Sequence, residues 1–187
     1  MPVFRKLLPA ELPRYRAHLL RLDRTDRYAR FTGTVSDQTI ERHCESIDWS
    51  RTVLIGAFVR NELRGAAELC TDRVLWPDEA EVGISVEKEL QGMRVGSTLV
   101  RRMLTVARNR GIRTLHMHCL ADNVRMRALC RRFGARLQME AGEFHASFDL
   151  PRPNQFSYAT EALEDGAGAV NAMLDRFSTD PDRRLAA

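Results

Sequence analysis

The stretch LQGMRVGSTLV, residues 90–100, has the composition of a turn that binds an anion. Glycines and polar residues precede apolar residues at helical spacing, so we expect a strand to pass into a helix here. The backbone N–H groups from Met93 to Ser97 then open the helix without acceptors of their own, at the positive end of its dipole. Arg94 adds a positive charge, and Gly96 lets a bulky group approach the backbone closely. These residues predict a site for a pyrophosphate.

Two familiar phosphate loops are excluded, because the stretch is neither a Walker loop nor a GxGxxG fingerprint. A plain strand-to-helix turn with a packing glycine has the same residue types. The turn by itself therefore leaves the function open.

The surrounding pattern predicts a mixed α/β sheet with helices that position this turn. A short strand VFRKL and helices over 10–22, 23–31 and 34–47 come first, with Ser36 as an N-cap. Runs of branched and aromatic residues then predict three strands of an antiparallel meander, at 51–59, 63–74 and 80–86. After the turn we expect the remaining elements in this order: a helix to about Arg110 capped by Gly111, a strand over 112–120, a helix over 122–134 with Asn123 as N-cap, and a hairpin over 135–150 around Ala141 and Gly142.

The last part of the chain changes character after Leu150. Residues 151–158 predict an extended linker, 159–177 a weak helix interrupted by two glycines, and 178–187 a disordered tail. We therefore expect one domain over 1–150 and a C-terminal appendage over 151–187.

Composition is that of a soluble globular chain. Its 187 residues are 44% hydrophobic and 29% charged, with 29 basic and 25 acidic side chains. No run is long enough to span a membrane, and the N-terminal residues lack the apolar core of a secretory signal, so we expect a cytoplasmic protein. The four cysteines show no CxxC pairing and are expected to be reduced thiols.

The order AEVGISV, QGMRVGSTL, strand, then DNVRMRALCRRFGA resembles the GNAT (GCN5-related N-acetyltransferase) superfamily. Gln91 and Gly96 match its coenzyme A motif, in which Arg94 replaces the middle glycine; we expect Arg94 to take an ordinary helical-entry conformation. A second signature is matched by Asn123, Leu129 and Gly134. The resemblance covers residues 52–149 and implies a mostly antiparallel, twisted sheet that splays at the fourth strand, with helices on both faces.

The resemblance also implies which residues bind acetyl-CoA. The backbone of the fourth strand would hold the pantetheine arm, Asn123 would lie near that arm, and the turn would cradle the pyrophosphate. The expected cofactor-binding residues are Ile84, Ser85, Val86, Gln91, Gly92, Met93, Arg94, Val95, Gly96, Ser97 and Asn123.

Acetyl transfer to an amine needs a base, and two glutamates are candidates. Alternation places Glu81 with Gly83 and Ser85 on one strand face, and the family often has a glutamate there. Glu68, on the neighbouring strand among small residues, is second, and the two roles are not exclusive. Each glutamate can equally be a solvent-facing side chain without a role.

A general acid is harder to find. The family's usual tyrosine, one residue after the apolar position of the second signature, is Cys130 here. A thiol can protonate a thiolate, but Cys130 also falls on the apolar face of its helix, and we favour an inert buried cysteine. Water or the substrate would then supply the proton.

Other chemistry fits less well. His116 and His118 share a strand face, but a zinc site needs further ligands that the sequence does not place, so no metal is expected. The arginines of the helix over 122–134 favour solvated charge or a contact to the 3′-phosphate of coenzyme A over nucleic acid, because no interleaved aromatic residues accompany them.

The sequence thus predicts an N-acetyltransferase that moves an acetyl group from acetyl-CoA to a primary amine by direct attack. The segment DRYARFTGTVSD is loosely similar to the GNAT module of bacterial protein-lysine acetyltransferases, so the acceptor is a small molecule or a protein lysine or N-terminus. A catalytically idle acyl-CoA-binding module and, more remotely, an arginine-faced nucleic-acid binder are the rival predictions. A homodimer is left open.

Overall fold

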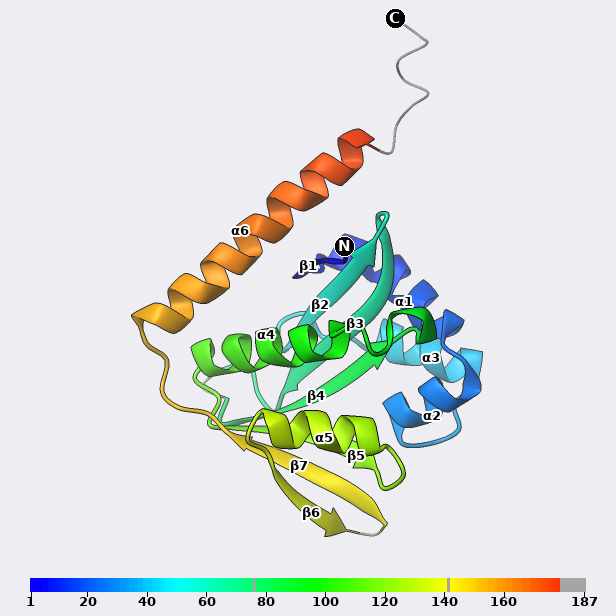
Figure 1. Ribbon diagram of the computed structural model, residues 1–187, viewed down its shortest axis with the longest axis vertical. Helices are drawn as coiled ribbons and strands as arrows, with labels where there is room; N and C mark the ends of the chain where they lie inside the picture. The colour runs from blue at the N-terminus through cyan, green and yellow to red at the C-terminus, as the bar shows by residue number, and fades with distance from the viewer. Residues whose placement is uncertain (76, 141, 179–187) are drawn as a thin grey trace, which may run out of the picture.

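The structure is a computed structural model that describes residues 1–75, 77–140 and 142–178 (Figure 1). A single sheet has the strand order β1-β2-β3-β4-β5-β7-β6. The strands are β1 (Val3–Lys6), β2 (Thr52–Val59), β3 (Glu62–Thr71), β4 (Glu79–Val86), β5 (Thr114–Leu120), β6 (Arg136–Glu140) and β7 (Glu143–Asp149). The helices are α1 (Leu12–Arg21), α2 (Arg24–Phe31), α3 (Asp37–Glu45), α4 (Val95–Asn109), α5 (Val124–Arg132) and α6 (Gln155–Ser178), with short 3-10 turns at Pro9–Glu11 and Lys88–Leu90.

The sheet splays after the first residues of β4, as expected. All neighbouring strands are antiparallel except β4 and β5, which are parallel. β4 pairs with β3 along most of its length, but it pairs with β5 only through Glu79, Ala80 and Glu81. After Glu81 the two strands diverge, so the edge of β4 that faces β5 has no strand partner there.

Helices cover both faces of the sheet because β2 and its neighbours are apolar on both sides. Val53 and Ile55 of β2 belong to the core that includes the apolar face of α4. Leu54 and Phe58 belong to a second core with Tyr15 and Leu19 of α1 and with Ile40 of α3. In Figure 1, α4 and the α1–α3 group lie on opposite sides of the sheet.

Local signals in the sequence place most helix ends correctly. The side chains of Ser36 and Asn123 accept hydrogen bonds from backbone N–H groups three residues on, so both act as N-caps. Gly111 and Gly134 have φ of 81° and end α4 and α5. The hairpin between β6 and β7 is also confirmed; Ala141 lies outside the described residues.

The C-terminal region differs from its prediction. Instead of an extended linker and an interrupted helix, residues 155–178 form one 24-residue helix. Lys6 of β1 forms ion pairs with Glu161 and Asp165, and Arg102 of α4 lies 2.9 Å from Glu164. These contacts stabilise a helix that the two glycines weaken. The predicted disordered tail, apart from Ser178, lies outside the described residues.

Within the described residues, no helix is both long and apolar enough to cross a membrane.

Candidate functional site

A large cleft opens where β4 and β5 diverge. Its volume is about 1040 Å³, and α2, β4, α4 and α5 line it. Every residue expected to bind the cofactor lines this cleft except Met93, whose side chain is 60% exposed. The structure therefore brings together residues from the fourth strand, the turn and the N-cap of α5.

The unpaired edge of β4 presents the backbone of alternate residues to the cleft. Glu87 N–H donates to Arg64 of β3, so the backbone of Ser85, two residues earlier, also points to β3. The N–H and C=O groups of Ile84 and Val86 consequently point the other way, into the cleft. The prediction that the backbone of Ser85 contacts the cofactor therefore disagrees with the pairing of β4 with β3.

Gln91 spans the end of this cleft. Its side-chain amide donates to the carbonyl of Val86 at 3.0 Å and to Asp26 of α2 at 2.9 Å. Its side-chain oxygen accepts from Arg125 of α5 at 3.4 Å. Gln91 thus connects three elements around the opening and occupies the carbonyl of Val86. The carbonyl of Ile84 faces the cleft.

The turn before α4 has the geometry of an anion site, with one departure from the prediction. Val95, Gly96 and Ser97 form the first turn of α4, where their N–H groups have no acceptor within the helix. Arg94 is the N-cap and has φ of 63°, a left-handed conformation. The expected helical-entry conformation of Arg94 is therefore wrong: this position demands the geometry that the family's glycine adopts without strain.

Positive charge predominates around the cleft, because four arginines line it against two aspartates, Asp26 and Asp122. Arg24 of α2, Arg94, and Arg125 and Arg132 of α5 all line it. Guanidinium groups match phosphate oxygens, so the arginines and the first turn of α4 form a donor set suited to a phosphorylated ligand. Sequence reasoning missed Arg24, because nothing in residues 23–31 indicates which helix face meets the cleft.

A second, smaller cavity continues from the cleft past β4. It has a volume of about 460 Å³ and shares Ala29, Ile84, Asn123 and Met126 with the cleft. The ionisable side chains that line it are Arg30, Glu81, His118 and Glu143. The two cavities therefore meet at the edge of β4.

Glu81 and Glu68 have different surroundings. Glu81 is exposed and lines the second cavity. Glu68 is buried, and its Oε2 atom contacts Tyr15 Oη at 2.8 Å, Arg30 Nη2 at 2.6 Å and His43 Nε2 at 2.9 Å. Burial raises the pKa of Glu68, but the hydrogen bond from His43 and the charge of Arg30 outweigh it and lower the pKa.

Arg30 connects Glu68 to the strand that carries Glu81. Its guanidinium packs over Gly83, where an added Cβ would lie 2.1 Å from Nη1. Glycine at this position allows α2 to reach the sheet. Glu68 thus helps to hold α2 in place.

Cys130 lies in the core and does not line the cleft. It is fully buried, with its Sγ 3.8 Å from Cys119 Sγ and 3.6 Å from Met117 Sδ. The hydrogen bond with Cys119 and burial raise the pKa of the Cys130 thiol. This environment fits the inert alternative.

The histidines form a cluster on the sheet. His145 of β7 lies opposite His118, and its Nε2 is 3.0 Å from His116 Nδ1. Across residues 1–75, 77–140 and 142–178, no group of three or more His, Cys, Asp or Glu side chains has the arrangement of a metal site.

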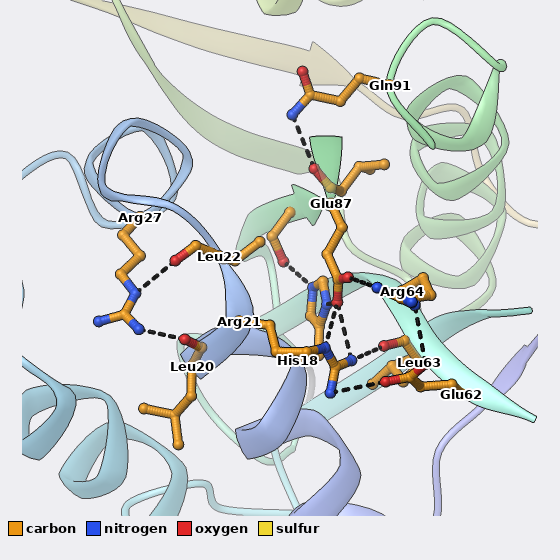
Figure 2. A network of polar contacts seen from close by, with 12 residues as sticks. His18, Leu20, Arg21, Leu22, Arg27, Glu62, Leu63, Arg64, Glu87 and Gln91 are labelled. Carbon is orange, nitrogen blue, oxygen red and sulfur yellow. Dashed lines mark hydrogen bonds and ion pairs between the residues drawn. The ribbon is translucent and has the colours of Figure 1, made fainter. Parts of the chain in front are cut away.

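The polar network at the end of β4 is drawn in Figure 2. His18 of α1 is fully buried; its Nδ1 lies 2.9 Å from Glu87 Oε1 and its Nε2 lies 2.9 Å from Ser85 Oγ. Arg21 and Arg64 also pair with Glu87. The network fastens α1 to the end of β4 on the face opposite α4.

Comparisons with known proteins identify relatives of this fold. A model of the "Acetyltransferase (GNAT) family" matches residues 17–135. The GNAT domain of S. lividans PAT is 24% identical, with a TM-score of 0.69 over 80% of this chain and 90% of that chain. PaiA N-acetyltransferase from Thermoplasma acidophilum, in complex with coenzyme A, is 17% identical, with a TM-score of 0.61 over 80% and 99%. Ribosomal-protein-alanine N-acetyltransferase from Brucella melitensis is 18% identical, with a TM-score of 0.61 over 79% and 99%.

Proposed function

This chain belongs to the acetyltransferase (GNAT) family, and we propose that it transfers an acetyl group from acetyl-CoA to a primary amine by direct attack. Two cavities that meet at the unpaired edge of β4 support this function. The larger cavity has the donors for a phosphorylated cofactor, and the smaller has a carboxylate for an amine. A cytoplasmic location is part of the proposal.

Acetyl-CoA would lie along the cleft. Its pyrophosphate would accept hydrogen bonds from the first-turn N–H groups of α4, with Arg94 nearby, and its pantetheine arm would bond to the backbone of Ile84. The coenzyme supplies the thioester, whose carbon–sulfur bond breaks as the amine nitrogen bonds to the carbonyl carbon. The N–H of Val86 points into the cleft and would stabilise the negative charge that develops on the carbonyl oxygen.

Glu81 is the base that we propose, directly or through a water molecule. It lines the second cavity beside β4, and its carboxylate is exposed. Glu68 is a poorer base because three donors already contact one of its oxygens and its pKa is lowered.

A proton donor for the departing thiolate is Tyr28 or water. Among the described residues that line the cleft, Tyr28 of α2 is the only phenol. Cys130, the residue at the family's tyrosine position, lies in the core.

The second cavity suits a cationic amine. Glu81 and Glu143 give it two carboxylates, and the guanidinium of Arg30, which also lines it, is paired with Glu68. Phe31, Met117 and Met126 give it apolar walls. A lysine side chain or a small alkylamine has the matching combination of a charged head and an apolar stem. An acyl-CoA-binding module without turnover is the second candidate, and the burial of Cys130 favours it.

Two experiments test the proposal. Thermal melting with acetyl-CoA, coenzyme A, ATP and NADH should show a shift only with the two coenzyme A species; saturation at a hundred times the dissociation constant adds about 2.7 kcal/mol. Thiol release with a panel of amines then measures turnover. Glu81→Gln should lower kcat by about 100-fold or more without weakening acetyl-CoA binding.

The matched control is Glu79→Gln, which changes a charged residue on the same face of β4 outside both cavities. Binding of acetyl-CoA without thiol release for any amine would support the binding module. No shift with either coenzyme A species would remove the function altogether.

A further inference from the structure

The second cavity has a guanidinium group on its wall as well as carboxylates. Arg30 of α2 lines the cavity, and its side chain is only 11% exposed. Nη2 of Arg30 donates to Glu68 at 2.6 Å, so one end of the guanidinium is used inside the protein. Nη1 lies over Gly83, which lines the same cavity, and Nε is buried without a hydrogen-bond partner. Among the described residues Nη1 has no acceptor either, so Arg30 has unused donors at the cavity wall.

Glu68 fixes this guanidinium before a ligand binds. The Glu68 oxygen that accepts from Arg30 also contacts Tyr15 and His43, so both side chains of the ion pair have little freedom. A fixed guanidinium binds a carboxylate with a small loss of side-chain entropy. Because Glu68 already neutralises much of its charge, Arg30 favours a carboxylate that has a cation beside it over an isolated anion.

Glu81 offers a place for that cation. Gly83, which the guanidinium covers, follows Glu81 by two residues on the same face of β4, a separation of about 7 Å along the strand. The charge of Glu81 acts on Arg30 across this distance, but in the described part of the chain Arg30 forms an ion pair with Glu68 alone. A guanidinium and a carboxylate that line one cavity without pairing are complementary to a ligand that carries an ammonium next to a carboxylate.

Glu143 adds a second carboxylate from another part of the cavity wall. It lies opposite Leu120 of β5, whereas Glu81 lies beside His116, four residues earlier on the same strand. Four residues of a strand span about 13 Å, so the two carboxylates come from well-separated positions. Apolar side chains also line the cavity. Glu143 is therefore placed to bind a second cation at the end of an apolar stem.

These charges have an opposite partner in an amino acid whose side chain is cationic. Arg30 and Glu68 balance each other, so Glu81 and Glu143 leave the cavity with an excess of negative charge; His118 is the remaining ionisable group that lines it. At neutral pH such an amino acid has one carboxylate and two cations, one for each glutamate. A lysine side chain within a protein lacks the free carboxylate.

We propose that the acceptor is a free α-amino acid with a cationic side chain. Its carboxylate binds Arg30, its α-ammonium lies at Glu81 and its side-chain cation lies at Glu143. This inference rests on the proposed acetyltransferase function. The α-nitrogen bonds to the acetyl carbon as the carbon–sulfur bond of acetyl-CoA breaks. Of the two protons that the ammonium loses, one leaves to solvent through Glu81 and the other is balanced by the proton that the coenzyme A thiolate takes up.

Thiol release at saturating acetyl-CoA tests the acceptor with three matched pairs: lysine and cadaverine, ornithine and putrescine, arginine and agmatine. Each pair differs by the carboxylate alone. For at least one pair, kcat/KM should be about 10-fold or more higher for the amino acid, because the diamine leaves Arg30 without its partner. Fragmentation of the product in a mass spectrometer should locate the acetyl group on the α-nitrogen.

Ratios of kcat/KM measured on one protein sample test the residues, because a loss of folded protein cancels in them. Arg30→Gln should bring the ratio of amino acid to diamine close to one. Arg27→Gln, on the same helix but outside both cavities, should keep the natural ratio. Glu143→Gln should lower the preference for lysine over norleucine, which lacks only the side-chain amine, and Glu140→Gln should keep it.

The outcomes separate this inference from the function on which it rests. Thiol release with the diamines or with a lysine-containing peptide, but with none of the three amino acids, would overturn the acceptor and leave the acetyltransferase proposal intact. An unchanged ratio in Arg30→Gln, or acetylation of the side-chain nitrogen, would also overturn the acceptor as placed here. Absence of thiol release with every amine would overturn both.

Discussion

His18 and Glu87 form a buried pair in which Nδ1 of the ring lies 2.9 Å from Oε1 of the carboxylate. Because the other ring nitrogen contacts Ser85, the pair fixes β4 at residues 85–87, next to the backbone groups that face the cleft. Neither residue lies near the other in sequence. The geometry of the β4 edge at the cleft therefore depends on α1, a helix on the face of the sheet opposite α4.

Acid should weaken this fixation. Burial raises the pKa of Glu87, but the hydrogen bonds from His18, Arg64 and Arg21 outweigh it and lower the pKa to about 2. A carboxylate with a lowered folded-state pKa stabilises the fold fully above about pH 5, and that contribution is lost as the pH falls towards 2. It amounts to about 3 kcal/mol. The buried His18, with its pKa lowered by burial, acts in the same direction below about pH 6.5, because the unfolded chain then binds the proton.

Urea unfolding between pH 7 and pH 3 measures the effect. Glu87→Gln should be less stable than the natural chain at pH 7 and should lose much of the pH dependence below pH 5. Glu62→Gln changes an exposed partner of the same two arginines and should keep the natural slope. Equal slopes for the natural chain and Glu87→Gln would show that the pair does not set the acid stability.

Local patterns predicted most of the fold, because each signal acts over a few residues. The N-caps Ser36 and Asn123 and the terminators Gly111 and Gly134 need only their own turn of helix. The alternation that put Glu81, Gly83 and Ser85 on one face likewise depends on strand geometry alone. The meeting of most of the predicted cofactor-binding residues in one cleft was predictable for the same reason: all of them except Asn123 lie in two short segments, 84–86 and 91–97.

What the sequence did not predict depends on distant partners. Glu68 takes its contacts from Tyr15, Arg30 and His43, which come from three separate helices. The continuity of α6 through Gly168 requires contact with β1 at the other end of the chain. No local rule gives either contact, so the sequence predicted neither the buried surroundings of Glu68 nor the continuity of α6.

Arg94→Gly should separate strain from charge. The left-handed conformation of Arg94 destabilises the fold by about 1 kcal/mol because the residue has a side chain. Glycine removes this strain, but it also gives the unfolded chain more freedom, which cancels part of the gain in stability. The melting temperature of the free protein should therefore rise slightly or stay level, while affinity for acetyl-CoA falls because a cleft guanidinium is gone. Arg94→Lys keeps the positive charge and the backbone strain, so it should change the melting temperature and the affinity for acetyl-CoA less. Unchanged affinity in the glycine variant would show that Arg94 does not contact phosphate.

Gly96→Trp should block the cleft without unfolding the domain. An added Cβ at Gly96 would meet only Leu129 of α5, at 3.7 Å, so a small side chain fits and a large one must fill the space between α4 and α5. The thermal shift with acetyl-CoA should disappear, whereas Gly96→Ala should keep most of it. A full shift in the tryptophan variant would move the pyrophosphate site away from this turn.

Cys130→Ala should alter stability more than catalysis. The thiol packs against Cys119 and Met117 in the core, so its removal leaves a small cavity and should cost about 1–2 kcal/mol of unfolding free energy. Measured below the melting temperature, kcat should change less than threefold, because the thiol does not reach the cleft. Tyr28→Phe removes the phenol of the cleft wall without a core defect and should lower kcat more strongly. A large fall in kcat for folded Cys130→Ala, with Tyr28→Phe unaffected, would instead make Cys130 the proton donor and require the core around it to open during turnover.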